Sequence, residues 1–306
     1  MNKGIHKENI RYLSISGNRM EALLIGNNGI PIVILTGLGC SFYEWNKIIG
    51  PLSETNRIIM FHRPGLGESE LHTNIRNTEM VVNEVVELLD VLEIEEKIIL
   101  IGHSYGGLCV QHFVNLYPHK VAGIILVDST SVDLKELDDL ELPILDEKGS
   151  DEYWLEIYHS FSLLVESELK KKINPIITEN QKKFPNEIQM KIIDFQIKPS
   201  LYKAIYLEMC SWKIDALKIK TLNSFPNVPL IVIARDKDYN IKLGVLDGLP
   251  EGELQILEEK WNQLIRDQVN LNSKSELILA TNSSHFVYLD RPDVIIVAIK
   301  KVIERI

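Results

Sequence analysis

Short apolar runs alternate along the chain with longer stretches in which apolar residues recur every three or four positions. Runs of strand length cover residues 31–35, 57–61, 97–101, 121–127, 228–234 and 276–280. Helical spacing covers residues 42–52, 78–92, 108–117, 254–269 and 292–303. This alternation predicts an α/β fold with a mostly parallel central sheet flanked by helices.

Two segments depart from this alternation. Residues 11–16 and 20–25 flank Gly17-Asn18, a tight-turn signal, and are expected to form a hairpin. Residues 131–224 contain no β-branched run of strand length, but Lys/Glu-rich amphipathic stretches with aromatic residues. We therefore expect a core of residues 1–130 and 225–306, with a helical cap of residues 131–224 inserted after the sixth strand.

Composition narrows the range of partners. The chain has 306 residues, with 33 Lys and Arg against 43 Asp and Glu, and a formal net charge of −10. Such a surface repels phosphate backbones and anionic lipids, so a small-molecule substrate is expected rather than nucleic acid or a membrane.

The three cysteines are widely spaced, which predicts neither disulfides nor a metal site. The start of the chain lacks an apolar signal-peptide core, and no segment is apolar for bilayer length, so a cytoplasmic location is expected. The sequence does not predict the number of subunits.

Residues Gly102-His103-Ser104-Tyr105-Gly106 match the pattern G-x-S-x-G. This motif makes a sharp turn between a strand and a helix and exposes the serine hydroxyl at the helix N-terminus. The expected strand precedes it and a helical segment follows it, as the motif requires. Ser104 is therefore the candidate nucleophile.

Three further segments resemble the α/β-hydrolase superfamily, in particular its cap-bearing branch of serine hydrolases. They are Thr36-Gly37-Leu38-Gly39, the run HRPGLGES at 62–69, and Ser284-His285-Phe286 followed by Asp290-Arg291-Pro292. Thr36 and His62 stand where the family usually has histidine and aspartate, but neither position is normally catalytic. The resemblance implies an α/β-hydrolase fold and a Ser-His-Asp triad that needs no cofactor.

His285 is the expected general base, because it closely follows the last predicted strand and comes after the serine, in the chain order of this fold. The oxyanion hole is expected from the backbone N–H groups of Leu38 and Tyr105. Gly37-x-Gly39 does not indicate dinucleotide binding, because Phe42 occupies the position of the third glycine.

Two aspartates are candidates for the triad acid. Asp238 lies after the strand at 228–234, where the superfamily usually places its acid, with Asp236 as a nearby substitute. A long segment follows that turn, however. Family members with a long loop there often look as if they use the aspartate after the sixth strand instead, and the resembling residue here is Asp128. We favour Asp128 and keep Asp238 as the alternative.

These residues predict hydrolysis of a carboxylic ester or lactone of a small organic substrate through an acyl-enzyme. A serine at residue 104 argues against epoxide hydrolases and haloalkane dehalogenases, which resemble this chain but have aspartate there. The alternatives are a C–C bond hydrolase and a hydrolase-fold ligand sensor that acts through a protein partner; a catalytically inactive scaffold is disfavoured by the intact set of residues. The cap aromatics Trp154, Tyr158, Phe161 and Trp212 are expected mainly to pack between cap helices.

Overall fold

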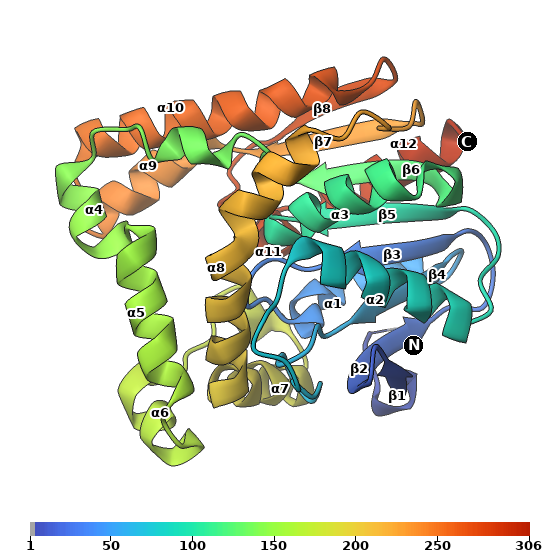
Figure 1. The fold of residues 1–306 in the computed structure, drawn as a ribbon, viewed down its shortest axis with the longest axis horizontal. Coiled ribbons are helices and arrows are strands. Elements are labelled where there is room, and N and C mark those ends of the chain that lie inside the picture. Colours follow the sequence, from blue (N-terminus) through green and yellow to red (C-terminus); the bar gives the residue numbers. More distant parts are fainter. Residues whose placement is uncertain (1–3) are drawn as a thin grey trace.

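A single mixed sheet forms the centre of the molecule (Figure 1). The computed structural model describes residues 4–306. Within them eight strands pair in the order β1-β2-β4-β3-β5-β6-β7-β8. The strands are β1 (Ile10–Ile15), β2 (Asn18–Ile25), β3 (Pro31–Leu35), β4 (Arg57–Phe61), β5 (Ile98–His103), β6 (Val121–Val127), β7 (Leu230–Arg235) and β8 (Ser275–Ala280). The β1–β2 and β2–β4 pairs are antiparallel and all others are parallel, so the predicted fold class is confirmed.

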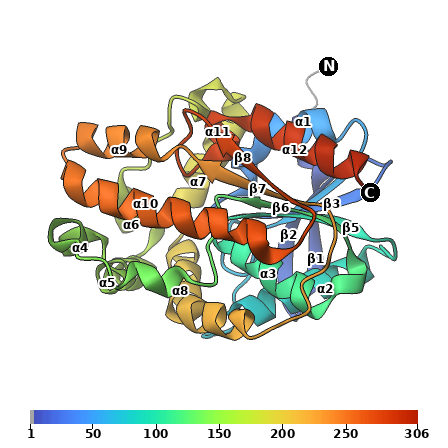
Figure 2. The ribbon, with the colours of Figure 1, turned by 90° about the horizontal axis from the view of Figure 1, so that it is seen from above.

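Helices cover both faces of the sheet (Figure 2). One face carries α2 (Thr78–Val91), α3 (Tyr105–Leu116) and α10 (Glu251–Asp267). The other carries α1 (Asn46–Leu52), α11 (Val287–Asp290) and α12 (Pro292–Glu304). The parallel strands are buried on both faces because two apolar layers enclose them, which explains their nearly continuous apolar sequences.

The segment between β6 and β7 is helical. Its helices are α4 (Pro143–Gly149), α5 (Asp151–Ser162), α6 (Glu166–Ile173), α7 (Asn186–Gln196) and α8 (Pro199–Lys220). No strand occurs between residues 131 and 224, all of which the structure describes. A separate apolar cluster that includes Leu169, Phe195 and Ile205 packs these helices together and onto Leu66 of the core.

Most predicted elements occur close to their expected positions, and two differ. Helix α3 begins at Tyr105, directly after the serine, rather than at residue 108. The segment after residue 236, expected to be a long loop, instead forms helix α9 (Lys237–Leu246). Its start is fixed by Asp236, whose side chain accepts hydrogen bonds from the N–H groups of Asp238 and Tyr239.

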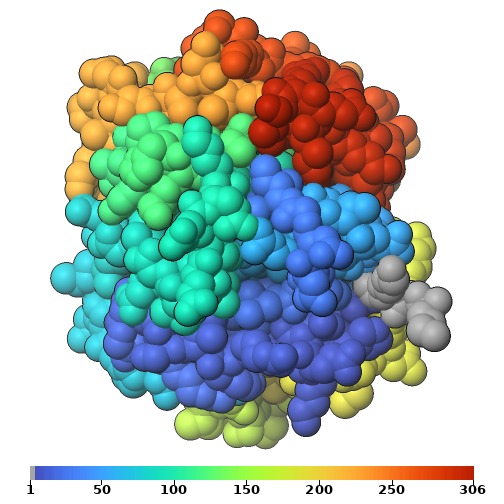
Figure 3. All heavy atoms as spheres, turned by 90° about the vertical axis from the view of Figure 1, so that its right-hand side faces the viewer, coloured from blue at the N-terminus to red at the C-terminus, as the bar shows by residue number. Residues whose placement is uncertain are grey.

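The N-terminal hairpin and the C-terminal segment are both visible on one face of the molecule. In Figure 3 the hairpin, in blue, lies in the lower half, and the C-terminal segment, in red, lies at the upper right. Among residues 4–306, no helix combines the length and apolar character needed to cross a bilayer.

Candidate active site

Ser104 lies at the turn where the chain passes from β5 into α3. Its backbone has φ 52° and ψ −124°, and residues other than glycine seldom adopt such a positive φ. A Cβ on Gly102 would come within 2.5 Å of the Gly107 Cα, and one on Gly106 within 2.2 Å of the Leu35 carbonyl oxygen. Glycine at these positions lets strand and helix meet closely, and the turn places Ser104 at the N-terminus of α3.

His285 and Asp128 lie together at the edge of the sheet where β6 and β8 end. His285 Nδ1 is 2.5 Å from Asp128 Oδ2. The Asp128 side chain is fully buried, whereas that of His285 is 26% exposed. Because Nδ1 donates its proton to the carboxylate, Nε2 carries none, and it has no hydrogen-bond partner among residues 4–306. Nε2 is therefore free to accept a proton.

Two other residues hold the Asp128 carboxylate. Trp261 Nε1 donates to Oδ1 at 3.1 Å, and the backbone N–H of Arg235 donates to the same oxygen at 3.3 Å. The Arg235 guanidinium donates to Oδ2 at 3.2 Å. Burial raises the pKa of Asp128, but the charge of Arg235 and the hydrogen bond from His285 outweigh it and hold that pKa below its usual range. Asp128 therefore stays ionised and can stabilise a protonated imidazole.

His103, the residue before Ser104, contacts His285. The two imidazole rings are 4.6 Å apart, and His103 Nε2 lies 2.9 Å from the carbonyl oxygen of His285, to which it donates. Burial, reinforced by the nearby His285, lowers the pKa of His103 to about 3, so its ring is neutral. Across residues 4–306 no hydrogen bond joins Ser104 directly to His285. Such catalytic hydrogen bonds are often long before substrate binds.

The N–H groups of Leu38 and Tyr105 make no hydrogen bond within the part of the chain that the structure describes. Tyr105 is the first residue of α3, where an N–H has no partner inside the helix. Leu38 lies in the loop after β3. A Cβ on the adjacent Gly37 would come within 3.1 Å of the Ser104 Cβ, so this loop closely approaches the serine. Both donors are therefore available near the Ser104 hydroxyl.

The buried guanidinium of Arg63 holds the loop that contains Leu38. Arg63 donates to the carbonyl oxygens of Thr36 and Gly37 at 2.8 and 3.0 Å. It also forms two hydrogen bonds, at 2.7 and 3.0 Å, with the carboxylate of Glu208 in α8. Burial lowers the pKa of Arg63, but the charge of Glu208 outweighs it and raises that pKa above its usual value. The loop is thus tied both to the core and to the cap.

Comparison with known proteins shows which folds this chain resembles. A family model described as the alpha/beta hydrolase fold matches residues 30–153. Over this segment the chain is similar to the α/β-hydrolase superfamily. The methyl ester esterase for pimeloyl-acyl-carrier protein from Wigglesworthia glossinidia brevipalpis is 27% identical over 245 residues, which cover 73% of this chain and 86% of that protein.

Solved structures of α/β hydrolases have the same fold as this chain. The enol-lactonase from Burkholderia xenovorans superposes with a TM-score of 0.67 at 17% identity, covering 96% of this chain and 100% of that one. A thermophilic esterase from Thermogutta terrifontis superposes with a TM-score of 0.63 at 17% identity, covering 95% and 97%. The predicted α/β-hydrolase fold is confirmed, and the expectation of an α/β-fold hydrolase agrees with these relatives.

A small cavity of about 70 Å³ adjoins Ser104. Its other lining residues are Ser129, Thr130, Ser131, Leu134, Leu137, Trp212, Trp261, Leu264 and Ile265. Of the four cap aromatics singled out in the sequence, Trp212 lines this cavity. Tyr158 and Phe161 pack against the apolar cluster of the cap, and Trp154 is 38% exposed. Most of these lining residues are apolar, and four carry hydroxyl groups: Ser104, Ser129, Thr130 and Ser131.

The two candidate acids have different surroundings. Asp238 is exposed on the first turn of α9, and no hydrogen bond or ion pair within residues 4–306 connects it to His285. The carboxylate of Asp236 is occupied by backbone N–H groups, including that of Asn282 at 2.9 Å. Of the three aspartates, Asp128 alone contacts His285 in the described chain.

The sequence did not indicate three residues that surround the acid: Arg235, Glu258 and Trp261. Arg235 directly precedes the turn that contains Asp236, but nothing in that segment marks it as a partner of a carboxylate 107 residues earlier in the chain. Glu258 and Trp261 lie three residues apart on α10, and this spacing places them on one face of the helix. That spacing is the one local signal that could have connected them.

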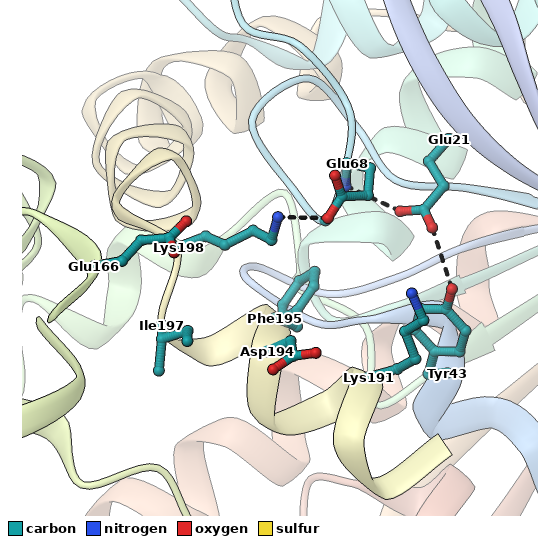
Figure 4. Close-up of a pocket in the computed structure, with 10 residues that line it drawn as sticks. Glu21, Tyr43, Glu68, Glu166, Lys191, Asp194, Phe195, Ile197 and Lys198 are labelled. Carbon is teal, nitrogen blue, oxygen red and sulfur yellow. Dashed lines mark hydrogen bonds and ion pairs between the residues drawn. The ribbon is translucent and has the colours of Figure 1, made fainter. Parts of the chain in front are cut away.

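A second cleft lies between the cap and the core and contains neither Ser104 nor His285 (Figure 4). Glu21 lines it and accepts hydrogen bonds from His62 Nδ1 at 2.7 Å and from the Tyr43 hydroxyl at 3.1 Å. On the other side of the His62 ring, Nε2 is 3.0 Å from the hydroxyl of Ser41. His62, which replaces the aspartate usual in the family, is thus buried in a polar network. Ser41 is buried as well, so this second serine–histidine pair has no access for a substrate.

Proposed function

We propose that the protein is a serine hydrolase that cleaves a carboxylic ester or lactone of a small organic substrate through an acyl-enzyme. The observation that supports this most directly is the contact between His285 and Asp128 beside the strained turn that presents Ser104. Two names among the related proteins, a methyl ester esterase and an enol-lactonase, point to the same bond type.

In the proposed reaction, Ser104 Oγ attacks the substrate carbonyl carbon while His285 Nε2 takes the hydroxyl proton. The negative oxygen that forms is stabilised by the N–H groups of Leu38 and Tyr105 and by the N-terminus of α3. His285 then gives its proton to the leaving alkoxide, and the C–O bond of the ester breaks. Throughout, the ionised Asp128 stabilises the imidazolium.

Deacylation repeats these steps with water as the nucleophile. His285 accepts a proton from the water, the hydroxide attacks the acyl carbonyl, and the proton returns to Ser104 Oγ as the carboxylic acid leaves. No redox change occurs, and the side chains present supply every proton transfer. We therefore propose that the enzyme works without a cofactor.

The small apolar cavity beside Ser104 favours a short acyl or alkyl group on one side of the scissile bond. Among p-nitrophenyl esters, acetate and butyrate should be cleaved with higher kcat/KM than decanoate. The cytoplasmic location and the small-molecule substrate stay predictions.

The decisive experiment compares the parent protein with Ser104→Ala on p-nitrophenyl butyrate. Removal of the nucleophile should lower kcat by several orders of magnitude, while thermal unfolding shows an intact fold. Equal rates in the two proteins would contradict the proposal. If both are inactive but a ligand shifts the thermal unfolding temperature strongly, the ligand-sensor alternative is favoured.

A further inference from the structure

Arg235, at the end of β7, lies between two carboxylates. It donates to Asp128 Oδ2 at 3.2 Å and forms two hydrogen bonds with Glu258 of α10, at 3.0 and 2.6 Å. Its guanidinium also lies 4.4 Å from the centre of the Trp261 ring. The Arg235 side chain is 10% exposed and that of Glu258 is 7% exposed. Arg235 and His285 therefore donate to the same buried oxygen, Asp128 Oδ2.

The same guanidinium is also next to the imidazole. Arg235 Nη1 is 3.4 Å from His285 Nδ1, and both groups act as donors toward Asp128. When His285 takes a proton, two positive charges face one carboxylate. Glu258 supplies the second negative charge, so Asp128, Arg235, Glu258 and a protonated His285 sum to zero. Without Glu258 the same group would carry one net positive charge.

We propose that Arg235 and Glu258 are positioning residues that orient Asp128 toward His285 and balance the charge that His285 acquires during catalysis. This inference rests on the proposed function of Ser104, His285 and Asp128. Neither residue reaches the reacting atoms of a substrate. Each acts through Asp128: Arg235 by direct hydrogen bonds, and Glu258 by fixing and neutralising Arg235.

Few charged groups among the described residues face His285. The effect of Arg235 and Glu258 on the potential at its ring can therefore be separated from the effects of other charges. Asp128 approaches His285 from the end of β6, Arg235 from β7 and Glu258 from α10. From β5, His103 faces the ring, but it is neutral because burial lowers its pKa to about 3. Changes of charge at Arg235 and Glu258 therefore dominate any change in the electrostatic potential at His285.

The closing experiment is a charge cycle with the variants E258Q, R235Q and R235Q/E258Q. In E258Q an unbalanced cation remains beside His285, so the acid limb of the kcat/KM profile should move down by about one pH unit. In R235Q an unbalanced carboxylate remains, so the limb should move up by a similar amount. The double variant restores the balance and should return close to the parent midpoint. KM should stay within about twofold while kcat falls about tenfold in each single variant.

A merely structural pair would give a different result. Loss of packing alone would leave the acid limb unmoved, or move it in the same direction in both single variants. Either outcome, in proteins with parental circular dichroism, overturns the proposal. R235K, which keeps the positive charge, should restore most of the kcat lost in R235Q. The matched control E259Q removes an exposed carboxylate on the same helix and should leave the profile unchanged.

A second readout separates this inference from the proposed function. The titration of the His285 ring is followed by NMR, with its signal assigned by its loss in His285→Asn. The opposite shifts in E258Q and R235Q should appear there without any substrate. If they do while the parent cleaves no ester, the proposed reaction fails and the charge balance stands. If the ester is cleaved and the signal does not move in either variant, the charge balance fails alone.

Discussion

Arg63, which follows β4, and Glu208, in α8, form a doubly hydrogen-bonded ion pair that is almost completely buried between core and cap. The other guanidinium N–H groups of Arg63 hold the carbonyls of Thr36 and Gly37. The backbone next to the candidate oxyanion donor Leu38 is therefore fixed by a contact with the cap. Helix α8 therefore contributes to the geometry of the candidate site.

Breaking this pair should be costly, because each single change leaves a buried charge without its partner. Glu208→Leu and Arg63→Met should each lower the free energy of unfolding by about 3–5 kcal/mol, measured by urea denaturation. The double variant Arg63→Met/Glu208→Leu should lose less than either single variant. Lys218→Ala, at an exposed ion pair with Glu79, is the control and should change stability by less than about 1 kcal/mol. Equal losses in the buried and exposed variants would contradict the expectation.

The identity of the triad acid can be tested by comparing Asp128→Asn with Asp238→Asn. The amide at residue 128 can no longer stabilise a protonated His285 and favours the wrong tautomer, so kcat should fall by about four orders of magnitude. Asp238 is exposed on α9, and its replacement should leave kcat nearly unchanged. Steady-state kinetics on p-nitrophenyl butyrate measure both. A large loss in Asp238→Asn with an unaffected Asp128→Asn would reverse the assignment.

Asp236 provides a third variant in that comparison. Its carboxylate caps α9 and accepts a hydrogen bond from the backbone of Asn282. Asp236→Ala should therefore lower the free energy of unfolding by about 1 kcal/mol, as for a helix N-cap, while most of kcat is retained. Parallel loss of stability and activity would indicate that the turn also positions His285.

The strands and the serine turn could be predicted because their signals are local. Fully apolar runs such as Pro31–Leu35 are buried on both faces, and the glycines around Ser104 are required by contacts of the turn itself. Helix α9 escaped prediction because none of its residues is buried, so it has no apolar stripe to mark it. The surroundings of Asp128 escaped for another reason. Arg235 and Glu258 meet only through the packing of α10 on β7, and the spacing of 23 residues carries no information about it.

Two glycines in helices should respond oppositely to alanine. A Cβ on Gly106 would lie 2.2 Å from the Leu35 carbonyl oxygen, so Gly106→Ala must push α3 away from β3 and should destabilise by about 1–3 kcal/mol. A Cβ on Gly252 in α10 would meet nothing within 4 Å, so Gly252→Ala should stabilise by about 0.5 kcal/mol. Urea denaturation of the two variants measures both signs. A neutral Gly106→Ala would show that strand and helix can separate without cost.

His103 should make the protein less stable in mild acid. Burial lowers its pKa from 6.5 to about 3, so between these values the unfolded chain takes up a proton that the folded protein does not. Since the unfolded state then binds more protons, the free energy of unfolding must fall as the pH falls through this window. The full contribution of His103 is present above pH 6.5 and is progressively lost below it.

The variant His103→Phe cannot take up that proton, so its free energy of unfolding should depend less steeply on pH. Between pH 6 and 4 its free energy of unfolding should fall by about 1 kcal/mol per pH unit less than that of the parent, since one bound proton corresponds to about 1.4 kcal/mol per unit. The comparison rests on the slope, so a uniform loss of stability from the missing hydrogen bond to His285 does not disturb it. An unchanged slope in His103→Phe would show that His103 is protonated in the folded protein, and the ring beside His285 would then carry a charge.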